Sequence, residues 1–296
     1  MVAVGVMGNG FIVLANGLDW IRSKTVSPSD MILTALSLSR LLYLGVVLGI
    51  HCLFFFDIDN PKRVPEVLLF FWGFANASTL WMSACLAAFY CMKLVNFSQA
   101  FFVKMKLHIS RLVPRLLLGS VLVSLIIALP IVCLEKCKYC CNETIVIQGS
   151  RNISCPGKLI SGFIYVVGTS PSFIIVLASS VILIHSLLRH ARKMQQNRGG
   201  VKDHRMDAHI SAVKTLVSFV VFFSFCYVSV VSLATFTSPW TIVTAVIGIT
   251  AYNSGHSVIL IATNPKLKQP LIRIVTSIKQ SPSCVNQHLS TVCFFL

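Results

Sequence analysis

The chain has 296 residues, of which 55% are hydrophobic and 11% are charged, and its mean hydropathy is +0.80. A soluble domain carries about 25% charged residues, so this composition excludes an ordinary water-facing globular protein and favours a membrane protein. The formal net charge of +16 would also suit a nucleic-acid-binding protein, and the positions of the charges decide between the two.

Seven apolar runs are long enough to cross a bilayer, which takes about 20 mostly apolar residues. In chain order they are 1–21, 28–50, 67–92, 112–134, 159–188, 212–236 and 239–263. The connectors between the runs carry nearly all of the charge. The sequence therefore predicts an all-α membrane protein, with a seven-transmembrane helix bundle over 1–263 and a tail over 264–296.

The connectors also predict the orientation, because the cytoplasmic loops of membrane proteins carry an excess of Lys and Arg. Of the 25 Lys and Arg residues, 18 lie in the connectors 22–27, 93–115 and 189–214 and in the tail. Only six lie in 57–66 and 135–158. We expect the N-terminus outside, the C-terminus inside, and the plasma membrane as the location. The net positive charge is then explained by the Lys and Arg residues of the cytoplasmic connectors and tail, and no nucleic-acid partner is expected.

The second outer connector, 135–158, has features of the secretory side of a membrane. Asn142 and Asn152 each begin an Asn-x-Ser/Thr sequon and are predicted glycosylation sites. Asn76 and Asn96 match the same pattern, but one lies inside an apolar run and the other on the predicted cytoplasmic side. No sugar is expected on either of them.

Four cysteines crowd the same connector: Cys137, Cys140, Cys141 and Cys155. In an oxidising compartment they could form one or two disulfides, which is the favoured interpretation. The C-x-x-C spacing of Cys137 and Cys140 also occurs in metal sites, but no histidine lies near it. No metal site is expected there.

Arg40 is a charged residue inside an apolar run. A charge at mid-bilayer costs about 2.5–3.5 kcal/mol on insertion scales, so such a side chain usually faces the bundle. Asn9 lies at a similar depth in the first run, and Ser254 and His256 lie slightly lower in the seventh. We expect these four residues to form a polar core, which could be an activation switch or a static clamp. The lack of a deep acidic residue disfavours a proton relay or an ion-coupled transporter.

The upper part of the third run carries Trp72, Asn76, Thr79 and Ser83 at a spacing that places them on one face of a helix. An aromatic ring beside an amide suits an apolar pocket with a few fixed polar groups. Packing between membrane helices produces the same pattern, because small and polar side chains also join helices. From the spacing alone, both interpretations stay open.

Enzyme motifs are missing from the sequence: it has no Gly-rich phosphate loop, no His-Glu-x-x-His and no paired carboxylates. Four histidines flank the connector 189–211, namely His185, His190, His204 and His209. They suit a boundary between helix and water better than a metal site. We expect no catalytic residue, no cofactor and no metal.

Six blocks of sequence occur in order along the chain and share their pattern with one receptor family. They are Asn9–Asn16 with Asp19-Trp20, Asp30–Leu36 with Ser39-Arg40, Leu86–Ser98, His185–His190, His209–Thr215 with Ser218-Phe219, and His256-Ser257 leading through Leu260-Ile261 to Asn264–Lys268. Together they resemble the bitter taste receptors, also called type 2 taste receptors. Any one block is weakly specific, whereas six in order across nearly the whole chain are highly specific.

This resemblance implies a G-protein-coupled receptor for small, often toxic organic agonists. It implies signalling through a gustducin-type heterotrimeric G protein at the surface of a sensory cell. It places Trp72 and Asn76 at ligand-contacting positions and Tyr227 near an aromatic ligand contact of the sixth helix, and Thr79 shares the face of Asn76. Family members often carry a charged residue on the upper seventh helix. Here 242–249 is apolar or small, so a salt-bridged ligand is not expected.

In such a receptor, an agonist bound between the third, fifth, sixth and seventh helices favours a state in which the inner ends of the fifth and sixth helices separate. Five residues are expected to face the G protein: Tyr90, Lys93, His185, Leu187 and Lys214. The basic residues near the third inner loop could instead rest on anionic membrane lipid, and both roles are compatible. A receptor oligomer is also left open.

Three alternatives remain at this point. A vomeronasal type 1-like pheromone receptor shares the architecture, but the blocks Leu86–Ser98 and Asn264–Lys268 favour the bitter class. A seven-helix transporter would need paired intramembrane charges or broken helices in repeated halves, and neither is evident. A nonfunctional receptor remnant is the third alternative, since the first run is short.

Overall fold

The computed structural model describes residues 1–56, 65–95, 108–148, 157–197, 204–236 and 238–273, together with 104 and 276. These ranges contain seven long helices. They are α1 (Val2–Ser23), α2 (Pro28–Phe56), α3 (Glu66–Leu94), α5 (Ile109–Gln148), α6 (Gly157–Asn197), α7 (His204–Thr235) and α8 (Pro239–Thr263). Each has an apolar stretch long enough to cross a membrane. The predicted bundle of seven membrane-length helices is thus confirmed.

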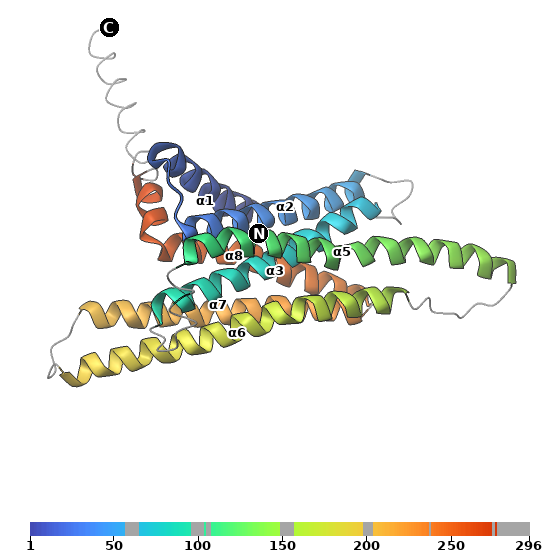
Figure 1. Ribbon diagram of the computed structural model, residues 1–296. Coiled ribbons are helices and arrows are strands. Elements are labelled where there is room, and N and C mark those ends of the chain that lie inside the picture. Colours follow the sequence, from blue (N-terminus) through green and yellow to red (C-terminus); the bar gives the residue numbers. More distant parts are fainter. Residues whose placement is uncertain are drawn as a thin grey trace, which may run out of the picture.

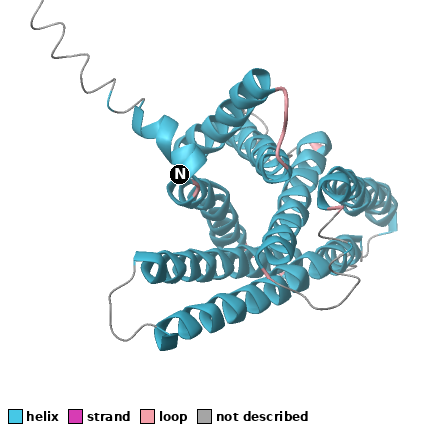
Figure 2. Cartoon of the chain, turned by 60° about the vertical axis from the view of Figure 1, so that its left-hand side comes forward, coloured by secondary structure: helices cyan, strands magenta, loops and turns pink. Residues whose placement is uncertain are grey.

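The helices lie side by side in one bundle, as Figures 1 and 2 show from two directions. Helix α3 is central and packs against α2, α5 and α6, while α1 packs against α2 and α8. At one end of the bundle α6 and α7 extend beyond the other helices, and at the opposite end α5 does so (Figure 1). The chain crosses the bundle seven times, so successive connectors alternate between the two ends.

Helix α5 extends further than its apolar run. The membrane-length part is Ile109–Cys133, but the helix continues to Gln148 through a segment that hydropathy predicts as a connector. The reason is that hydropathy marks the stretch that suits lipid, not the residue at which a helical backbone ends. The side chains of Asn142 and of Cys137, Cys140 and Cys141 lie outside the described part of the chain, as do Asn152 and Cys155.

Glycines bring several helix pairs close together. A Cβ on Gly5 would lie 2.5 Å from Ser254 Oγ, and one on Gly8 would lie 2.6 Å from Ser257 Oγ, so α1 and α8 are in tight contact. A Cβ on Gly162 of α6 would lie 2.6 Å from the Ala234 carbonyl oxygen of α7. Small residues commonly join membrane helices, because lipid supplies no hydrophobic force between them.

A proline lies inside α6, directly after Ser170. Pro171 has no N–H to donate to the carbonyl one turn earlier, at Val167. The Ser170 hydroxyl lies 3.2 Å from that carbonyl oxygen and 2.6 Å from the Val166 oxygen. The helix is therefore preserved through the proline, and it keeps Tyr165 and Phe173 on the face toward α3 and α7.

Candidate functional site

Arg40 is fully buried in the middle of the bundle. Its Nη2 donates a hydrogen bond to the Tyr252 hydroxyl at 3.2 Å and a short one to His256 Nδ1. A guanidinium has no acceptor, so Nδ1 of His256 must accept. The Tyr252 hydroxyl lies 2.9 Å from Ser83 Oγ. One guanidinium thus joins α2 to α8 and, through Tyr252, to α3.

Asn9 joins α1 to the same region. Its Nδ2 donates to the Gly5 carbonyl at 2.8 Å and to the Asn253 carbonyl at 3.1 Å. Ser254 packs against Gly5, and its hydroxyl has no hydrogen-bond partner among the described residues. The four predicted polar-core residues therefore do share the α1–α2–α8 region, although no hydrogen bond joins Arg40 to Asn9 or Ser254.

Tyr252 and Asn253 are members of this polar core that the sequence did not single out. Tyr252 lies one helical turn before His256, and the two rings are parallel with centroids 5.6 Å apart. The i to i+4 spacing to a candidate histidine is the signal that could have identified it. Asn253 contributes its backbone carbonyl, for which the sequence carries no signal.

On the predicted face of upper α3, Asn76 and Thr79 are buried and Trp72 is partly buried. The Asn76 amide nitrogen and the Thr79 hydroxyl have hydrogen-bond partners, whereas Asn76 Oδ1 has none among the described residues. Asn76 donates from Nδ2 to the Tyr165 hydroxyl at 3.0 Å, and this hydroxyl donates to the Gly73 carbonyl at 3.2 Å. The Thr79 hydroxyl donates to the Ala75 carbonyl of its own helix at 2.9 Å. Tyr165 on α6 is a further candidate that sequence reasoning missed.

Trp72 and Tyr227, the two predicted aromatic ligand contacts, each pack against another ring. The Trp72 ring is tilted against Tyr43 of α2, with centroids 6.4 Å apart. The Tyr227 ring of α7 stacks on Phe173 of α6, with centroids 4.3 Å apart and planes 10° apart. Trp72, Asn76 and Thr79 therefore lie together on α3, and Tyr227 lies at the contact between α6 and α7.

A cavity of about 790 Å³ opens at the end of the bundle that holds Lys93 and Lys266. Helices α3, α6, α7 and α8 supply an apolar wall: Leu86, Leu183, Leu187, Leu216, Phe219 and Leu260. Asp30, Tyr90, Lys93 and Lys266 add polar groups. Tyr90, Lys93 and Leu187 were predicted to face a G protein. His185 and Lys214, predicted with them, are exposed on α6 and α7 and do not line this cavity.

Residues 1–279 match the family model described as Taste receptor protein (TAS2R). Taste receptor type 2 member 8 of Pongo pygmaeus is 32% identical over 290 residues, which cover 93% of this chain and 93% of that protein. Member 8 of Homo sapiens is 32% identical, with 92% of each chain covered. Member 10 of Papio hamadryas is 34% identical, with 93% of this chain and 90% of the relative covered.

The chain belongs to the type 2 taste receptor family. This membership confirms the resemblance seen in the six sequence blocks, and it favours a bitter taste receptor over a vomeronasal receptor or a transporter. The protein is a multi-pass membrane receptor of the G-protein-coupled class, which is not a class of enzymes.

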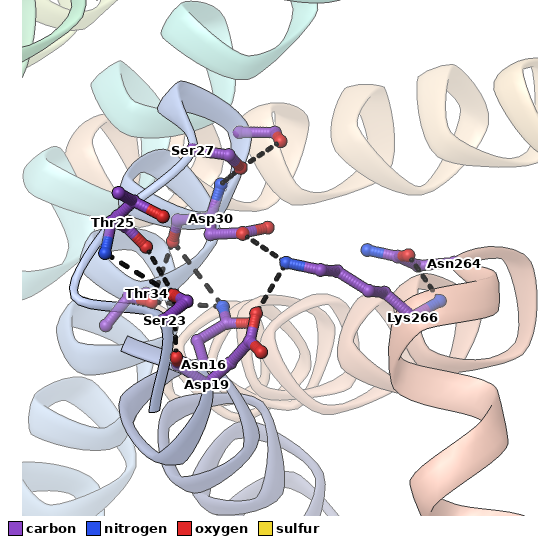
Figure 3. A network of polar contacts seen from close by, with 10 residues as sticks. Asn16, Asp19, Ser23, Thr25, Ser27, Asp30, Thr34, Asn264 and Lys266 are labelled. Atoms are coloured by element: carbon purple, nitrogen blue, oxygen red, sulfur yellow. Dashed lines mark hydrogen bonds and ion pairs between the residues drawn. The ribbon is translucent and has the colours of Figure 1, made fainter. Parts of the chain in front are cut away.

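In this taste receptor, an ionic clamp of Asp19, Asp30 and Lys266 joins α1, α2 and the exit from α8 (Figure 3). Lys266 Nζ donates to Asp19 Oδ2 at 2.6 Å and to Asp30 Oδ2 at 2.8 Å. These hydrogen bonds, that to Asp19 first, raise the pKa of Lys266 above its ordinary value, so the Lys266 ammonium stays charged at physiological pH. The Asp30 side chain is 11% exposed, whereas that of Asp19 is 50% exposed.

The clamp is held by its surroundings on both sides. The Lys266 N–H donates to Asn264 Oδ1 at 3.0 Å, which fixes the turn after α8. Asn16 of α1 donates to the Thr34 hydroxyl of α2 at 3.0 Å, beside Asp30. Leu267 is almost fully buried next to Lys266. Because the backbone on both sides is already held in place, the three charged groups meet at a small cost in conformational entropy.

We expect Lys266→Met to lower the free energy of unfolding by about 1–2 kcal/mol, because it leaves the nearly buried Asp30 carboxylate without its cation. Asp19→Asn should change it by less than about 0.5 kcal/mol, since exposed ion pairs contribute little. The double variant Asp30→Asn/Lys266→Met should be more stable than Lys266→Met alone. Thermal unfolding of the purified receptor in detergent measures all three. Equal losses for Lys266→Met and Asp19→Asn would refute the dominant role of Asp30.

Proposed function

We propose that this protein is a plasma-membrane receptor that binds small bitter-tasting organic compounds and signals through a gustducin-type heterotrimeric G protein. The cavity of about 790 Å³ carries the proposal, because three predicted G-protein-facing residues, Tyr90, Lys93 and Leu187, line it. Its wall of leucines suits an inserted apolar helix face, and Lys93 suits a carboxylate on that partner.

The excess of Lys and Arg supports placing this end of the bundle in the cytoplasm. In this orientation the N-terminus is outside, 1–263 form the receptor domain, and 264–296 form a cytoplasmic tail. Asn142 and Asn152 are then extracellular and available for glycosylation. The basic residues near the third inner loop meet the G protein and the anionic lipid of the inner leaflet.

Agonists would bind toward the outer end, where Trp72 of α3 packs against Tyr43 of α2 and Asn76 of α3 bonds Tyr165 of α6. Thr79 lies one turn further along α3, and Tyr227 lies at the contact between α6 and α7. A ligand that fits better when the inner ends of α6 and α7 are apart shifts the population toward that state. His256 links the two regions, because it bonds Arg40, lines the cavity, and lies 4.7 Å from the Phe219 ring of α7 between ring centroids. Movement of α7 would therefore disturb the partner of Arg40.

The proposal is tested by calcium imaging of cells that express the receptor with a promiscuous gustducin-like G protein, screened against a panel of bitter compounds. We expect dose-dependent responses that vanish without the G protein. Silence across a broad panel, with the receptor confirmed at the cell surface, would refute the proposed function.

Two substitutions test the agonist site. We expect Trp72→Ala and Asn76→Ala each to raise the half-maximal agonist concentration at least about tenfold, because each would remove a ligand contact worth more than about 1.4 kcal/mol. Trp240→Ala is the matched control: Trp240 is 79% exposed at the start of α8 and should leave potency unchanged. Unchanged potency in both α3 variants would exclude this face as the ligand site.

A further inference from the structure

We propose that the buried guanidinium of Arg40 binds a small monovalent anion, and that chloride is the ion that suits its chemistry. Arg40 belongs to α2 and meets α8 in the middle of the bundle. Such a site is separate from the agonist and G-protein sites. It would balance a positive charge that neither binding an agonist nor coupling to a G protein requires.

The partners of Arg40 in the described part of the chain are neutral groups. The Arg40 side chain is fully buried, and its Nη2 donates to the Tyr252 hydroxyl and to His256 Nδ1. Because Nδ1 accepts this hydrogen bond, the imidazole of His256 is neutral. The Tyr252 ring adds a cation–π contact, with 5.1 Å between the guanidinium carbon and the ring centroid. None of these contacts supplies a negative charge.

No acidic side chain whose placement the structure describes approaches Arg40. Two of the three described carboxylates are held in the ionic clamp. The third, Glu66, begins α3, about 25 Å along that helix from Ser83, which lies level with Arg40 because it bonds the same Tyr252 hydroxyl. A buried charge is normally paired with an opposite charge, so this guanidinium calls for an anion.

The guanidinium has donors left for such an anion. Of its five N–H groups, the two on Nη2 are used by Tyr252 and His256. Nε and Nη1 carry the other three, and both atoms are buried without a hydrogen-bond partner among the described residues. A water molecule would accept from these groups but leave the charge unbalanced, whereas an anion does both.

Two buried serine hydroxyls add donors beside the guanidinium. Ser37 lies one helical turn before Arg40 on the same side of α2, and its buried Oγ has no hydrogen-bond partner among the described residues. Ser254 Oγ is unpartnered in the same sense, and it reaches the same point beside Gly5 as the side chain of Leu44, one turn after Arg40. Guanidinium and hydroxyl donors together suit a halide.

The cavity that Tyr90 and Lys93 line gives an anion a route to this site. His256 is part of its lining and also bonds Arg40, so the cavity reaches a direct partner of the guanidinium. The ammonium group of Lys93 in the same lining favours anions over cations. An anion in the cavity is therefore one side chain away from Arg40.

The test is thermal unfolding of the purified full-length receptor in detergent, with potassium chloride exchanged for potassium gluconate at constant ionic strength. For the wild type, the melting temperature should rise with chloride and level off, by about 3 °C or more at about 150 mM. Constant ionic strength holds general screening fixed, so the rise reports an ion that fits a site. Bromide, with the same charge and nearly the same size, should act as chloride does.

Four variants locate the effect. Arg40→Met should abolish the dependence on chloride, whereas Arg115→Met, at an exposed position on α5, should keep it. Ser37→Ala should raise the chloride concentration of half-maximal effect by about threefold or more, because it removes one donor. Ser39→Ala is the matched control on α2: its hydroxyl already donates to the Ala35 carbonyl at 3.1 Å, so the half-maximal concentration should stay the same.

Bromide located by anomalous scattering in crystals of the receptor gives a readout that needs no variant. A bromide peak within hydrogen-bond distance of the Arg40 guanidinium is expected, and peaks confined to the protein surface would overturn the site. A melting temperature that ignores chloride, or that responds equally in the wild type and in Arg40→Met, would overturn it too. Water would then satisfy Arg40 together with Asn9 Oδ1, a buried acceptor that also has no partner among the described residues.

The proposal remains testable if Arg40→Met does not fold. In that case the two serine variants and the bromide peaks decide, and equal half-maximal chloride concentrations for Ser37→Ala and the wild type would refute the site. None of these measurements involves an agonist or a G protein. Their failure would therefore leave the proposed receptor function untouched.

Discussion

Replacing Arg40 by methionine should reduce the agonist-evoked response to background while the protein still reaches the membrane. The Arg40 guanidinium joins α2 to Tyr252 and His256 of α8, and hydrogen bonds to charged groups contribute about 1.5–3 kcal/mol each. Losing both would shift the equilibrium between receptor states by about 3 kcal/mol or more, which is a factor of about 100.

Arg40→Met should reduce agonist-evoked signalling much more than it reduces insertion of the receptor into the membrane. Arg40→Met also removes the cost of burying a charge, and exchanging buried ionic groups for apolar ones is often neutral for stability. Calcium responses and surface labelling therefore have to be measured on the same cells. Arg115→Met, at an exposed position on α5, is the control and should respond like the wild type. A normal dose–response curve for Arg40→Met would show that this polar core is dispensable.

Gly162→Leu should produce the second large effect, by forcing α6 and α7 apart at the end of the bundle where α6 begins. Even a Cβ at this position would lie 2.6 Å from the Ala234 backbone oxygen, and a backbone atom cannot rotate away. Overpacking of this kind costs about 1–3 kcal/mol. We expect a clearly lowered melting temperature of the purified receptor and a weakened agonist response.

Gly45→Leu is the matched control for this substitution. A Cβ on Gly45 would meet nothing within 4 Å, and the residue faces outward from α2. Removing glycine from a helix is worth about 0.5–1 kcal/mol, so this variant should be as stable as the wild type or slightly more stable. If Gly162→Leu were equally well tolerated, close contact between α6 and α7 would not be needed for the fold.

The two large predictions address different parts of one receptor. Arg40 lies where α2, α3 and α8 meet, and its partner His256 borders the cavity that Tyr90 and Lys93 line. Gly162 lies at the opposite end, where α6 and α7 contact each other beyond the proposed agonist site. Comparing the two variants distinguishes loss of the bonds between Arg40 and α8 from loss of the close contact between α6 and α7.

The amino-acid sequence by itself determined the seven membrane helices and the family. Apolar length is a property of each stretch of about 20 residues, so it can be read without knowing any contact. The sequence also indicated that Arg40 faces inward, since a charge toward lipid would be costly. The ordered blocks from Asn9 to Lys268 identified the family, because they depend on residue identity and order alone.

Only the tertiary structure decided which side chains meet. Lipid-facing and core-facing surfaces of these helices are both apolar, so a pattern of hydrophobic residues does not define how each helix is rotated about its axis. Three contacts depend on that rotation and on the relative heights of the helices. They are the bonds of Arg40 to α8, the hydrogen bond between Asn76 and Tyr165, and the ion pair of Lys266 with Asp30. These contacts join residues far apart in the chain, and a single sequence carries no record of their pairing.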